Sequence, residues 1–346
     1  MTDDEKYMRR CIQLAKNGKK NAQPNPMVGA VIVCNGRIIG EGYHQRCGEG
    51  HAEVNAIASV RDPNLLKQST IYVSLEPCAH YGKTPPCADL IISKGIPRVV
   101  VGCMDPFAKV NGLGVKKLRD AGMEVEVGVL EAECQALNKR FMTFHSLHRP
   151  FVTLKWAQSA DGFIGISGQR TAISNDLAQT ICHKRRAEHQ AIMVGRVTAE
   201  TDNPRLDVRR WVGDNPVRVV IDRQLTLPTT LHLFDGTVPT VVFTARATTC
   251  HLPNTEYECI DFTTDIVPQM LHRLYSRGIQ SLLVEGGARL LQSFIDAQMW
   301  DEAYVETSHQ PLSQGVEAPV IRLGNVVSLE DVDGHTMTCL NNPLKK

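Results

Sequence analysis

The sequence predicts two consecutive α/β domains. Its 346 residues exceed the length that a single hydrophobic core usually serves. Strand-like apolar runs alternate with helical segments through both halves, which is typical of sheets covered by helices. Arg149-Pro150 has the character of a linker between the halves. We therefore expect domains at residues 1–147 and 148–346.

The elements of the first half follow from periodicity and turn residues. Residues 5–18 have apolar positions at helical spacing. Residues 30–34 and 37–40 should form a hairpin around Asn35-Gly36, the strongest short hairpin signal. Gly95 and Gly122 are typical residues after a helix C-terminus. The remaining predicted strands are 70–75, 98–102 and 123–127, and the remaining predicted helices are 51–60, 87–94, 115–120 and 131–146.

The second half repeats the alternation without repeating the sequence. Strands are predicted at 151–157, 191–194, 217–221, 240–243, 281–284 and 302–306, and helices at 176–188, 267–277 and 288–296. The tail after about Asp333 has little pattern, so we expect it to be poorly ordered.

Composition limits the classes of function. The net charge is +1 and no long Lys/Arg run is present, whereas nucleic-acid binders usually carry a basic excess. No apolar stretch reaches membrane-spanning length. The acidic start lacks the apolar core of a secretory signal, and eleven scattered cysteines suggest reduced thiols. We expect a cytoplasmic protein without nucleic-acid or membrane partners.

A group of metal-binding residue types lies in the first quarter of the chain. His51 and Glu53 are separated by one residue, and Cys78 and Cys87 each follow a proline. One His and two Cys would hold Zn²⁺ with its fourth position open to water, as catalytic zinc sites do. Glu53 would then move protons. This order is that of zinc deaminases acting on nucleobases, so we expect hydrolytic deamination of a ring carbon.

Other interpretations of these residues stay open at this point. Buried cysteines often serve packing alone. A structural zinc site would need a fourth ligand, for which His80 is the nearest candidate. A zinc-stabilised RNA-binding module would bind RNA in a salt-dependent manner. For the catalytic interpretation, Pro77 is expected to open a helix and thereby favour the thiolate of Cys78.

The longer motifs resemble a known family, the bifunctional riboflavin-biosynthesis deaminase/reductases. The residues that carry the resemblance are Pro24-Asn25-Pro26-x-Val28-Gly29, Gly42-Tyr43-His44, Gly50-His51-Ala52-Glu53, Asp105-Pro106, Asn111-Gly112-x-Gly114 and the long loop Leu75-Glu76-Pro77-Cys78-x-His80-x-Gly82-Lys83-Thr84-Pro85-Pro86-Cys87. The resemblance implies a cytidine-deaminase-like α/β/α sandwich. It also implies deaminase substrate contacts from Asn25, His44, Lys83 and Thr84, the last two at the phosphate.

Two motifs of the second half resemble the reductase domain of the same family, which has a dihydrofolate-reductase-like α/β fold and uses NADPH. They are residues 155–162, Lys-Trp-Ala-Gln-Ser-Ala-Asp-Gly, and residues 284–290, Val-Glu-Gly-Gly-Ala-Arg-Leu. A Gly-Gly turn between a strand and a helix lets a phosphate approach the backbone. Position by position, the resemblance implies substrate contacts from Lys155, Asp161, Arg186, Leu206, Arg209 and Glu285. It implies cofactor contacts from Ala157, Ser174, Thr198, Asp202, Gly286, Gly287, Ala288 and Arg289.

One stretch departs from the family pattern. Many members have Ser-x-Trp-Ile-Thr/Ser where this chain has Arg170-Thr171-Ala172-Ile173-Ser174. Ala172 thus replaces a tryptophan that contacts the cofactor, and the contacts at Arg170 and Ala172 must differ.

Taken with the resemblance, the sequence predicts a bifunctional enzyme of riboflavin biosynthesis. The first domain would deaminate diaminohydroxyphosphoribosylaminopyrimidine with Zn²⁺, and the second would reduce the ribosyl group of the product to ribityl with NADPH. We expect small phosphoribosylated pyrimidines as substrates and a homo-oligomer. The alternative is a zinc deaminase of another base or nucleoside with a non-functional second domain, which detectable NADPH binding would exclude.

Overall fold

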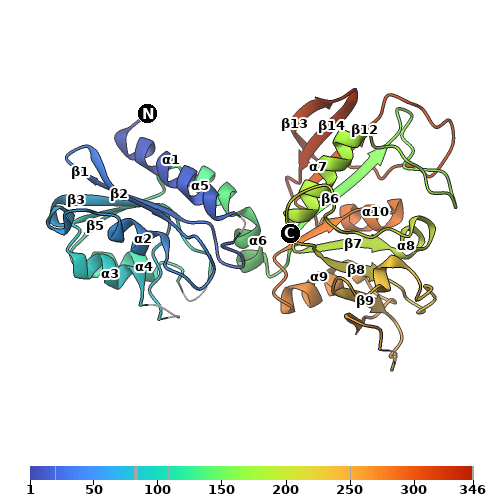
Figure 1. Cartoon of the computed structure of the whole chain (residues 1–346), viewed down its shortest axis with the longest axis horizontal. Helices are drawn as coiled ribbons and strands as arrows, with labels where there is room; N and C mark the ends of the chain where they lie inside the picture. The colour runs from blue at the N-terminus through green and yellow to red at the C-terminus, as the bar shows by residue number, and fades with distance from the viewer. Residues whose placement is uncertain (20, 82–84, 108–109, 250, 345–346) are drawn as a thin grey trace. The chain divides into compact units, whose positions relative to one another are not determined.

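The computed structural model of the protein describes residues 1–19, 21–81, 85–107, 110–249 and 251–344. The chain divides into two units, Met1–Ser146 and Leu147–Lys346. Each unit has its own sheet and its own hydrophobic core (Figure 1). This division falls one residue from the expected boundary. Among the described residues, no helix is both long and apolar enough to cross a membrane.

The sheet of the first unit has five strands in the order β2-β1-β3-β4-β5. The strand β1 is antiparallel to β2 and β3, whereas β3, β4 and β5 are parallel. The turn between β1 and β2 lies at Asn35 and Gly36, which both have positive φ, as the Asn-Gly signal predicts. The strands are β1 (Gly29–Cys34), β2 (Arg37–Tyr43), β3 (Ser69–Leu75), β4 (Arg98–Cys103) and β5 (Glu124–Val127).

Helices cover both faces of this sheet (Figure 1). Alternate residues of a strand point to opposite faces. Val31 and Val33 therefore pack with α1 (Asp3–Ala15) and α5 (Glu131–Leu137), while Ala30 and Ile32 pack on the other side. The helices of that second side are α2 (Ala52–Ala58), α3 (Cys87–Lys94) and α4 (Leu113–Asp120). The α/β/α sandwich is the predicted architecture.

The first and last helices of this unit differ from their predicted ranges for local reasons. The first begins at Asp3 because Thr2 caps it, in a capping box with Glu5. The helix expected over 131–146 is divided into α5 and α6 (Lys139–Leu147). Between them, the Asn138 side chain accepts a hydrogen bond from Met27 N and donates one to Met27 O, both at 2.8 Å. Short 3₁₀ helices occupy Lys16–Gly18 (η1) and Pro63–Gln68 (η2).

The second unit has a sheet of nine strands in the order β10-β9-β8-β7-β11-β6-β12-β14-β13. The first seven strands in this order, from β10 to β12, are parallel to one another. The last two, β14 and β13, close the sheet in antiparallel orientation. The predicted strands are β6 (Phe151–Gln158), β7 (Ala191–Gly195), β8 (Val217–Ile221), β9 (Thr240–Thr244), β11 (Ser281–Val284) and β12 (Glu302–Thr307). The strands that were not predicted are β10 (Thr255–Cys259), β13 (Asn325–Val332) and β14 (His335–Asn341).

Helices again cover both faces of the sheet. Residues of α9 (Ile266–Ser276) and α10 (Ala288–Asp296) pack with Leu282 and Val284 of β11. Residues of α8 (Arg196–Asp202) and the 3₁₀ helix η3 (His232–Phe234) pack with Leu283 on the opposite face. The helix α7 (Asp176–Ala187) lies over β12, where the Arg185 guanidinium stacks on the Tyr304 ring.

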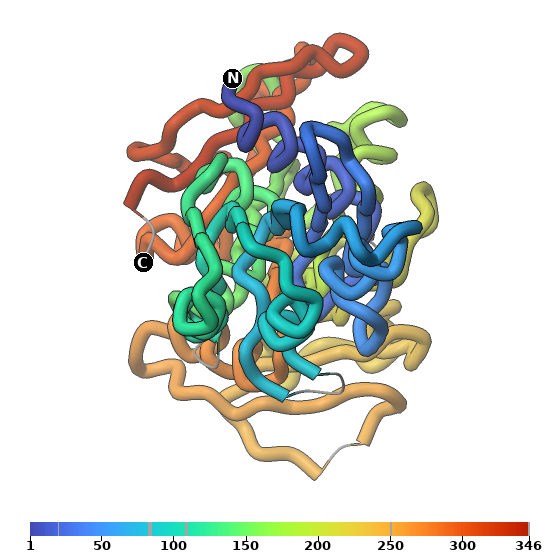
Figure 2. The backbone as a smooth tube through the Cα atoms, turned by 90° about the vertical axis from the view of Figure 1, so that its left-hand side faces the viewer, coloured from blue at the N-terminus to red at the C-terminus, as the bar shows by residue number. Residues whose placement is uncertain are grey.

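The expectation of a poorly ordered tail after Asp333 is wrong. The strand β14 pairs with β12 on one side and with β13 on the other, so it lies inside the sheet. It forms a hairpin with β13 around Asp333 and Gly334, which both have positive φ. Asp-Gly is itself a hairpin signal. Figure 2 shows this red hairpin at the top and the orange-yellow strands of the opposite sheet edge at the bottom.

Candidate functional site

Three side chains of metal-binding type meet at one end of the first sheet. His51 precedes α2, Cys78 follows β3 and Cys87 begins α3. The ligand atoms of all three lie within 4.8 Å of one another. His51 Nδ1 is 3.6 Å from Cys78 Sγ and 3.3 Å from Cys87 Sγ. No other described group of three His, Cys, Asp or Glu side chains lies so close together.

The local electrostatics of Cys78 differ from the prediction. Pro77 does not open a helix, and α3 begins only at Cys87. Cys78 Sγ forms hydrogen bonds with the Cys87 side chain, with His51 and with the backbone N–H of Cys87 (3.3 Å). Together these contacts outweigh burial and lower the pKa of Cys78 to about 4. The hydrogen bond between the two thiols raises the pKa of Cys87, so Cys78 is the first of the two to ionise.

These residues fit a zinc ion. One imidazole nitrogen and two cysteine sulfurs are zinc ligands, and a set of three leaves the fourth tetrahedral position free. His80 is not part of the group; its ring packs edge-on against Phe107, 6.1 Å between centroids. The donor set is therefore that of a catalytic zinc site with a position for water, and the part of the chain that the structure describes adds no fourth ligand of a structural site.

Glu53 lies beside the ligands in the first turn of α2 and is 3% exposed. Burial disfavours the charged form and raises the pKa of this carboxyl to about 7, although His51 acts in the opposite direction. A carboxyl group with such a pKa exchanges protons readily near neutral pH. Glu53 thus has the burial and the proton affinity expected of a general acid-base group.

Two further residues expected in the deaminase pocket lie next to the ligands. Asn25 Nδ2 is 3.2 Å from His44 Nε2, and His44 Nδ1 is 3.2 Å from Gly50 O. The rings of His44 and His51 are edge to face at 5.3 Å. Burial lowers the pKa of His44, which favours a neutral ring able to accept or donate a hydrogen bond. Lys83 and Thr84 lie outside the described residues.

Glu76 organises this end of the sheet, and the sequence analysis gave it no role. Its buried carboxylate accepts hydrogen bonds from four backbone N–H groups, those of Asp105, Gly112, Gly114 and Val115. It thereby holds the segment around Asp105 and the N-terminus of α4 next to Cys78. A charged residue in the apolar run that precedes Pro77 was the signal that could have identified it.

In the second unit an ion pair joins two of the expected substrate residues. Arg186 of α7 donates from Nε (2.9 Å) and Nη2 (2.7 Å) to the two oxygens of Glu285, which follows β11. Arg186 also donates to Asp207 O, and Asp207 forms an ion pair with Arg209. The structure thus brings Arg186, Arg209 and Glu285 together, while the Leu206 side chain is buried in the core.

Lys155 and Asp161, also expected to contact substrate, have different surroundings. Lys155 Nζ is 3.8 Å from Glu306 Oε2. Asp161 accepts hydrogen bonds from Ser159 Oγ and from the backbone N–H groups of Leu312 and Ser313. The Asp161 carboxylate therefore holds the loop at Leu312 and Ser313. Among the described residues, no hydrogen bond links Asp161 to the Arg186–Glu285 pair.

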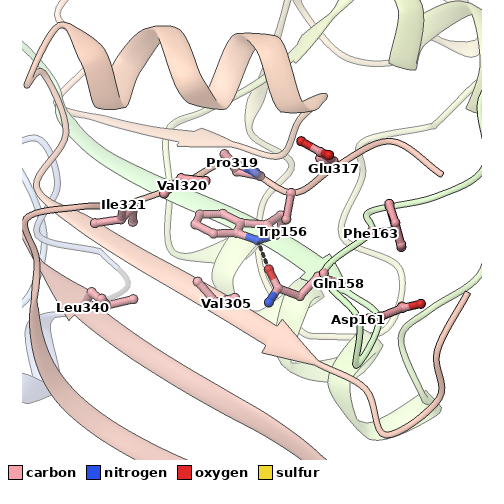
Figure 3. A pocket seen from close by; sticks show the side chains of 12 residues that line it. Trp156, Gln158, Asp161, Phe163, Val305, Glu317, Pro319, Val320, Ile321 and Leu340 are labelled. Atoms are coloured by element: carbon pink, nitrogen blue, oxygen red, sulfur yellow. Dashed lines mark hydrogen bonds between the residues drawn. The ribbon is translucent and has the colours of Figure 1, made fainter. Parts of the chain in front are cut away.

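Asp161 also borders a cavity of about 520 Å³ (Figure 3). Its apolar wall includes Trp156 of β6 and Val305 of β12, and the Trp156 indole donates to Gln158 Oε1 at 2.8 Å. Because alternate residues of β6 point to opposite faces, Trp156 and Gln158 point away from the face that carries Lys155. The cavity is therefore separate from the side of the sheet on which Lys155 lies.

The expected cofactor residues surround the turn between β11 and α10. Gly286 O accepts from Gly195 N at 2.8 Å, which ties this turn to the start of α8. A Cβ on Gly287 would lie 3.1 Å from Thr198 Oγ1, so any side chain at residue 287 would fill the space between this turn and Thr198. Gly287 is the N-cap residue of α10, and no side chain at this position bonds to the first turn of the helix. The backbone N–H groups of that turn can therefore bind a phosphate. These residues fit the phosphate groups of a dinucleotide.

The remaining expected cofactor residues are spread over three elements. Ala157 lies on β6, directly opposite Glu306 of β12. Ser174 Oγ donates to Glu306 Oε2 at 2.6 Å. Burial raises the pKa of Asp202 at the end of α8. Ala288 and Arg289 are the first two residues of α10.

Comparison with known proteins covers both halves of the chain. Residues 1–103 match the family described as the cytidine and deoxycytidylate deaminase zinc-binding region, and residues 150–319 match the RibD C-terminal domain. The riboflavin biosynthesis protein RibD of Aquifex aeolicus is 38% identical over 318 residues, which cover 90% of this chain and 89% of the relative. The chain belongs to the RibD family. The RibD of Bacillus amyloliquefaciens is 41% identical over 310 residues, 87% of this chain and 83% of the relative.

Solved structures of RibD proteins have the same fold over the whole chain. A Thermotoga maritima protein described as a diaminohydroxyphosphoribosylaminopyrimidine deaminase/5-amino-6-(5-phosphoribosylamino)uracil reductase superposes with a TM-score of 0.87 at 38% identity, covering 98% of this chain and 99% of that one. Acinetobacter baumannii RibD has a TM-score of 0.89 at 31% identity, covering 99% of each chain. The predicted cytidine-deaminase-like and dihydrofolate-reductase-like α/β folds are confirmed. Because the RibD relatives match both halves, a deaminase with a non-functional second half is not favoured.

Proposed function

We propose that the first domain hydrolyses the 2-amino group of 2,5-diamino-6-(5-phosphoribosylamino)pyrimidin-4(3H)-one, and that the second domain reduces the ribosyl group of the product. The final product is then 5-amino-6-(5-phosphoribitylamino)uracil. The observation that carries this proposal is the three-ligand group of His51, Cys78 and Cys87 with buried Glu53 beside it. The Thermotoga relative that bears both activities in its description supports the choice of substrate.

In the deamination, Glu53 is the group that moves protons. A zinc ion held by the three ligands would supply the positive charge that makes the attacking water more acidic. Glu53 takes a proton from this water as the water oxygen bonds to the ring carbon, and it gives this proton to the ring nitrogen that receives the electrons of the C=N double bond. It then carries the remaining hydroxyl proton to the amino group as the exocyclic C–N bond breaks, so ammonia departs and a carbonyl remains. Asn25 and His44 hold the pyrimidine, and Lys83 and Thr84 hold its phosphate.

In the reduction, the protein binds and orients two ligands. NADPH would supply the hydride, with its phosphates at the Gly286-Gly287 turn and the start of α10 and further contacts from Ala157, Thr198 and Asp202. The substrate would lie against Lys155 and the Arg186–Glu285 pair. Arg209 remains about half exposed beside Asp207, which suits contact with a phosphate that arrives from solvent.

The two activities are assigned to residues 1–147 and 148–346. Each unit has a hydrophobic core of its own, which supports independent folding. The fragment 1–147 should therefore bind zinc and release ammonia without NADPH. If the purified fragment folds and binds zinc but is inactive, the deaminase pocket needs residues from outside the fragment.

A homo-oligomer is part of the proposal, with β13 as its contact. This strand is at the edge of the sheet, and Val326, Val327 and Leu329 are 60–68% exposed on it. An apolar edge strand with free N–H and C=O groups readily pairs with another strand. Sedimentation of the wild type and of Leu329→Lys tests this; an unchanged size of the variant would exclude β13 as the contact.

The location is proposed to be the cytoplasm, with no nucleic-acid partner. Ten of the eleven cysteines lie among the described residues, and none of these ten is joined in a disulfide, as is usual in a reducing compartment. The net charge of +1 gives no basic excess for nucleic-acid binding.

The proposed function is tested by one coupled assay. The phosphoribosylated diaminopyrimidine is supplied with and without NADPH, while ammonia and NADPH oxidation are both measured. We expect ammonia in both reactions and NADPH oxidation only after ammonia has been released. NADPH oxidation without ammonia release would contradict the order of the two steps.

A further inference from the structure

His183 is a buried histidine of α7 that the proposed reduction does not use. It is 3% exposed, in the third turn of the helix. Its Nδ1 accepts a hydrogen bond from the backbone N–H of Arg209 at 3.3 Å. Arg209 is the residue proposed above to bind the phosphate of the reductase substrate. His183 thus holds the main chain of a proposed substrate residue.

The segment 206–209 is fixed at three points. The Leu206 side chain is buried in the core. Asp207 O accepts a hydrogen bond from Arg186 Nη1 at 3.2 Å, and Arg209 N donates to His183. His183 and Arg186 are three residues apart in α7, so they lie on the same side of the helix. One side of α7 therefore fixes the main chain before Arg209 and at Arg209 itself.

The hydrogen bond determines the protonation state of the His183 ring. A backbone N–H group can only donate, so Nδ1 carries no proton and the ring proton lies on Nε2. Burial, and after it the charges of Arg186 and Arg209, lower the pKa of His183 to about 4. Asp207 and Glu285 act in the opposite direction and are outweighed. The ring is therefore neutral near pH 7 and can accept this hydrogen bond.

The Arg209 side chain has little support of its own. It is 49% exposed and forms an ion pair with Asp207, two residues before it. An exposed arginine loses side-chain entropy when it binds a phosphate, and a mobile main chain would increase this loss. The bond to His183 removes the mobility of the main chain before the substrate arrives. Arg186, by contrast, is already held by both oxygens of Glu285.

We propose that His183 is a positioning residue of the reductase, which holds the main chain of Arg209 so that the guanidinium group meets the substrate phosphate. The proposal rests on the phosphate contact that the proposed function gives to Arg209. His183 itself touches neither substrate nor cofactor and acts through Arg209. Its loss should therefore weaken binding of the phosphorylated substrate and leave the hydride transfer and NADPH binding unchanged.

Two substitutions of His183 separate this role from a role in packing. His183→Leu has a similar size but no acceptor, whereas His183→Asn places an amide oxygen near the position of Nδ1. Both are assayed with 5-amino-6-(5-phosphoribosylamino)uracil and NADPH. We expect His183→Leu to raise KM for this substrate about tenfold, with kcat within about twofold of the wild type. His183→Asn should recover most of the lost affinity, and NADPH affinity, measured by fluorescence, should be unchanged in both.

A substrate without phosphate gives a second measurement. The matched riboside, 5-amino-6-ribosylaminouracil, lacks the group that Arg209 is proposed to bind. The wild type and His183→Leu should therefore have the same KM for the riboside. The control variant is His272→Leu, at an exposed histidine inside α9, and its KM for both substrates should equal that of the wild type.

A double substitution tests whether His183 acts through Arg209. In an Arg209→Ala background, His183→Leu should change KM by less than about twofold, because the side chain that it positions is absent. Additive effects of the two substitutions would overturn the proposal. Should His183→Leu fail to fold, as judged by tryptophan fluorescence, His183→Gln takes its place, since its amide lies one carbon too far from α7 to reach the same N–H group.

The remaining outcomes distinguish failure of this proposal from failure of the phosphate contact. A wild-type KM in His183→Leu together with a raised KM in Arg209→Ala would overturn the role of His183 and retain the contact. A wild-type KM in Arg209→Ala would overturn both. An equal rise of KM in His183→Leu and His183→Asn, or the same rise for the riboside, would reduce His183 to a structural residue and overturn the proposal.

Discussion

Glu76→Gln tests how strongly one buried carboxylate holds the deaminase pocket together. In the wild type, Oε1 accepts from the N–H groups of Gly114 (2.9 Å) and Val115 (3.1 Å), and Oε2 from those of Gly112 (2.9 Å) and Asp105 (3.3 Å). Glutamine keeps one acceptor oxygen, so two of these N–H groups would face an NH₂ group. Each buried donor left without a partner costs about 1–3 kcal/mol, which predicts a loss of about 2–6 kcal/mol in the first domain.

The assay follows the two domains separately. All three tryptophans lie in the second domain, at Trp156, Trp211 and Trp300, so their fluorescence reports only its unfolding. Unfolding of the first domain in urea is followed by zinc release to a coloured chelator. Glu76→Gln should lower the urea midpoint of zinc release and leave the fluorescence midpoint unchanged. The control is Glu133→Gln, at an exposed position of α5. Equal zinc-release midpoints for the two variants would refute this account of Glu76.

Four further outcomes are expected from single substitutions. Cys87→Ser should lose most of its zinc by metal analysis; full zinc content together with full ammonia release would rule out Cys87 as a ligand. Glu53→Gln should keep its zinc while ammonia release falls by at least about a hundredfold, and near-normal release would place the proton path elsewhere. Arg209→Ala should raise KM for the reductase substrate and leave NADPH affinity intact, measured by NADPH fluorescence. Gly287→Val should do the reverse, because a side chain there meets Thr198; normal NADPH binding would remove the cofactor from that turn.

Local sequence signals predicted most of the fold, and they failed where pairing depends on distant strands. The helix α3 has its predicted limits because Gly95 ends it in the left-handed conformation. The Asn35-Gly36 hairpin was found, but the Asp333-Gly334 hairpin was not, although its turn signal is similar. Its strand β13 is an edge strand exposed on both faces, so apolar and polar residues do not alternate in it.

The residues of the two candidate sites could likewise be predicted where a local motif contains them, and could not where distant segments bring them together. The zinc ligands could be predicted because the deaminase motif places them in a fixed order and spacing. Glu76 could not, because its partners lie between 29 and 39 residues further along the chain. Glu306 meets Lys155 only through the pairing of β12 with β6, which no motif shows. Asp161 matches the family pattern, yet its oxygens are taken by a loop some 150 residues away.

The position of β14 inside the second sheet has a consequence for synthesis of the chain. Every strand of the first domain is synthesised before residue 147, so that domain can fold while translation of the second domain continues. The second sheet stays incomplete until residue 341 exists, because β12 and β13 have no common partner before then. During that interval β12 offers an unpaired edge, which is a site of aggregation. A transcript cut short before residue 335 would therefore yield a complete first domain joined to an aggregation-prone half.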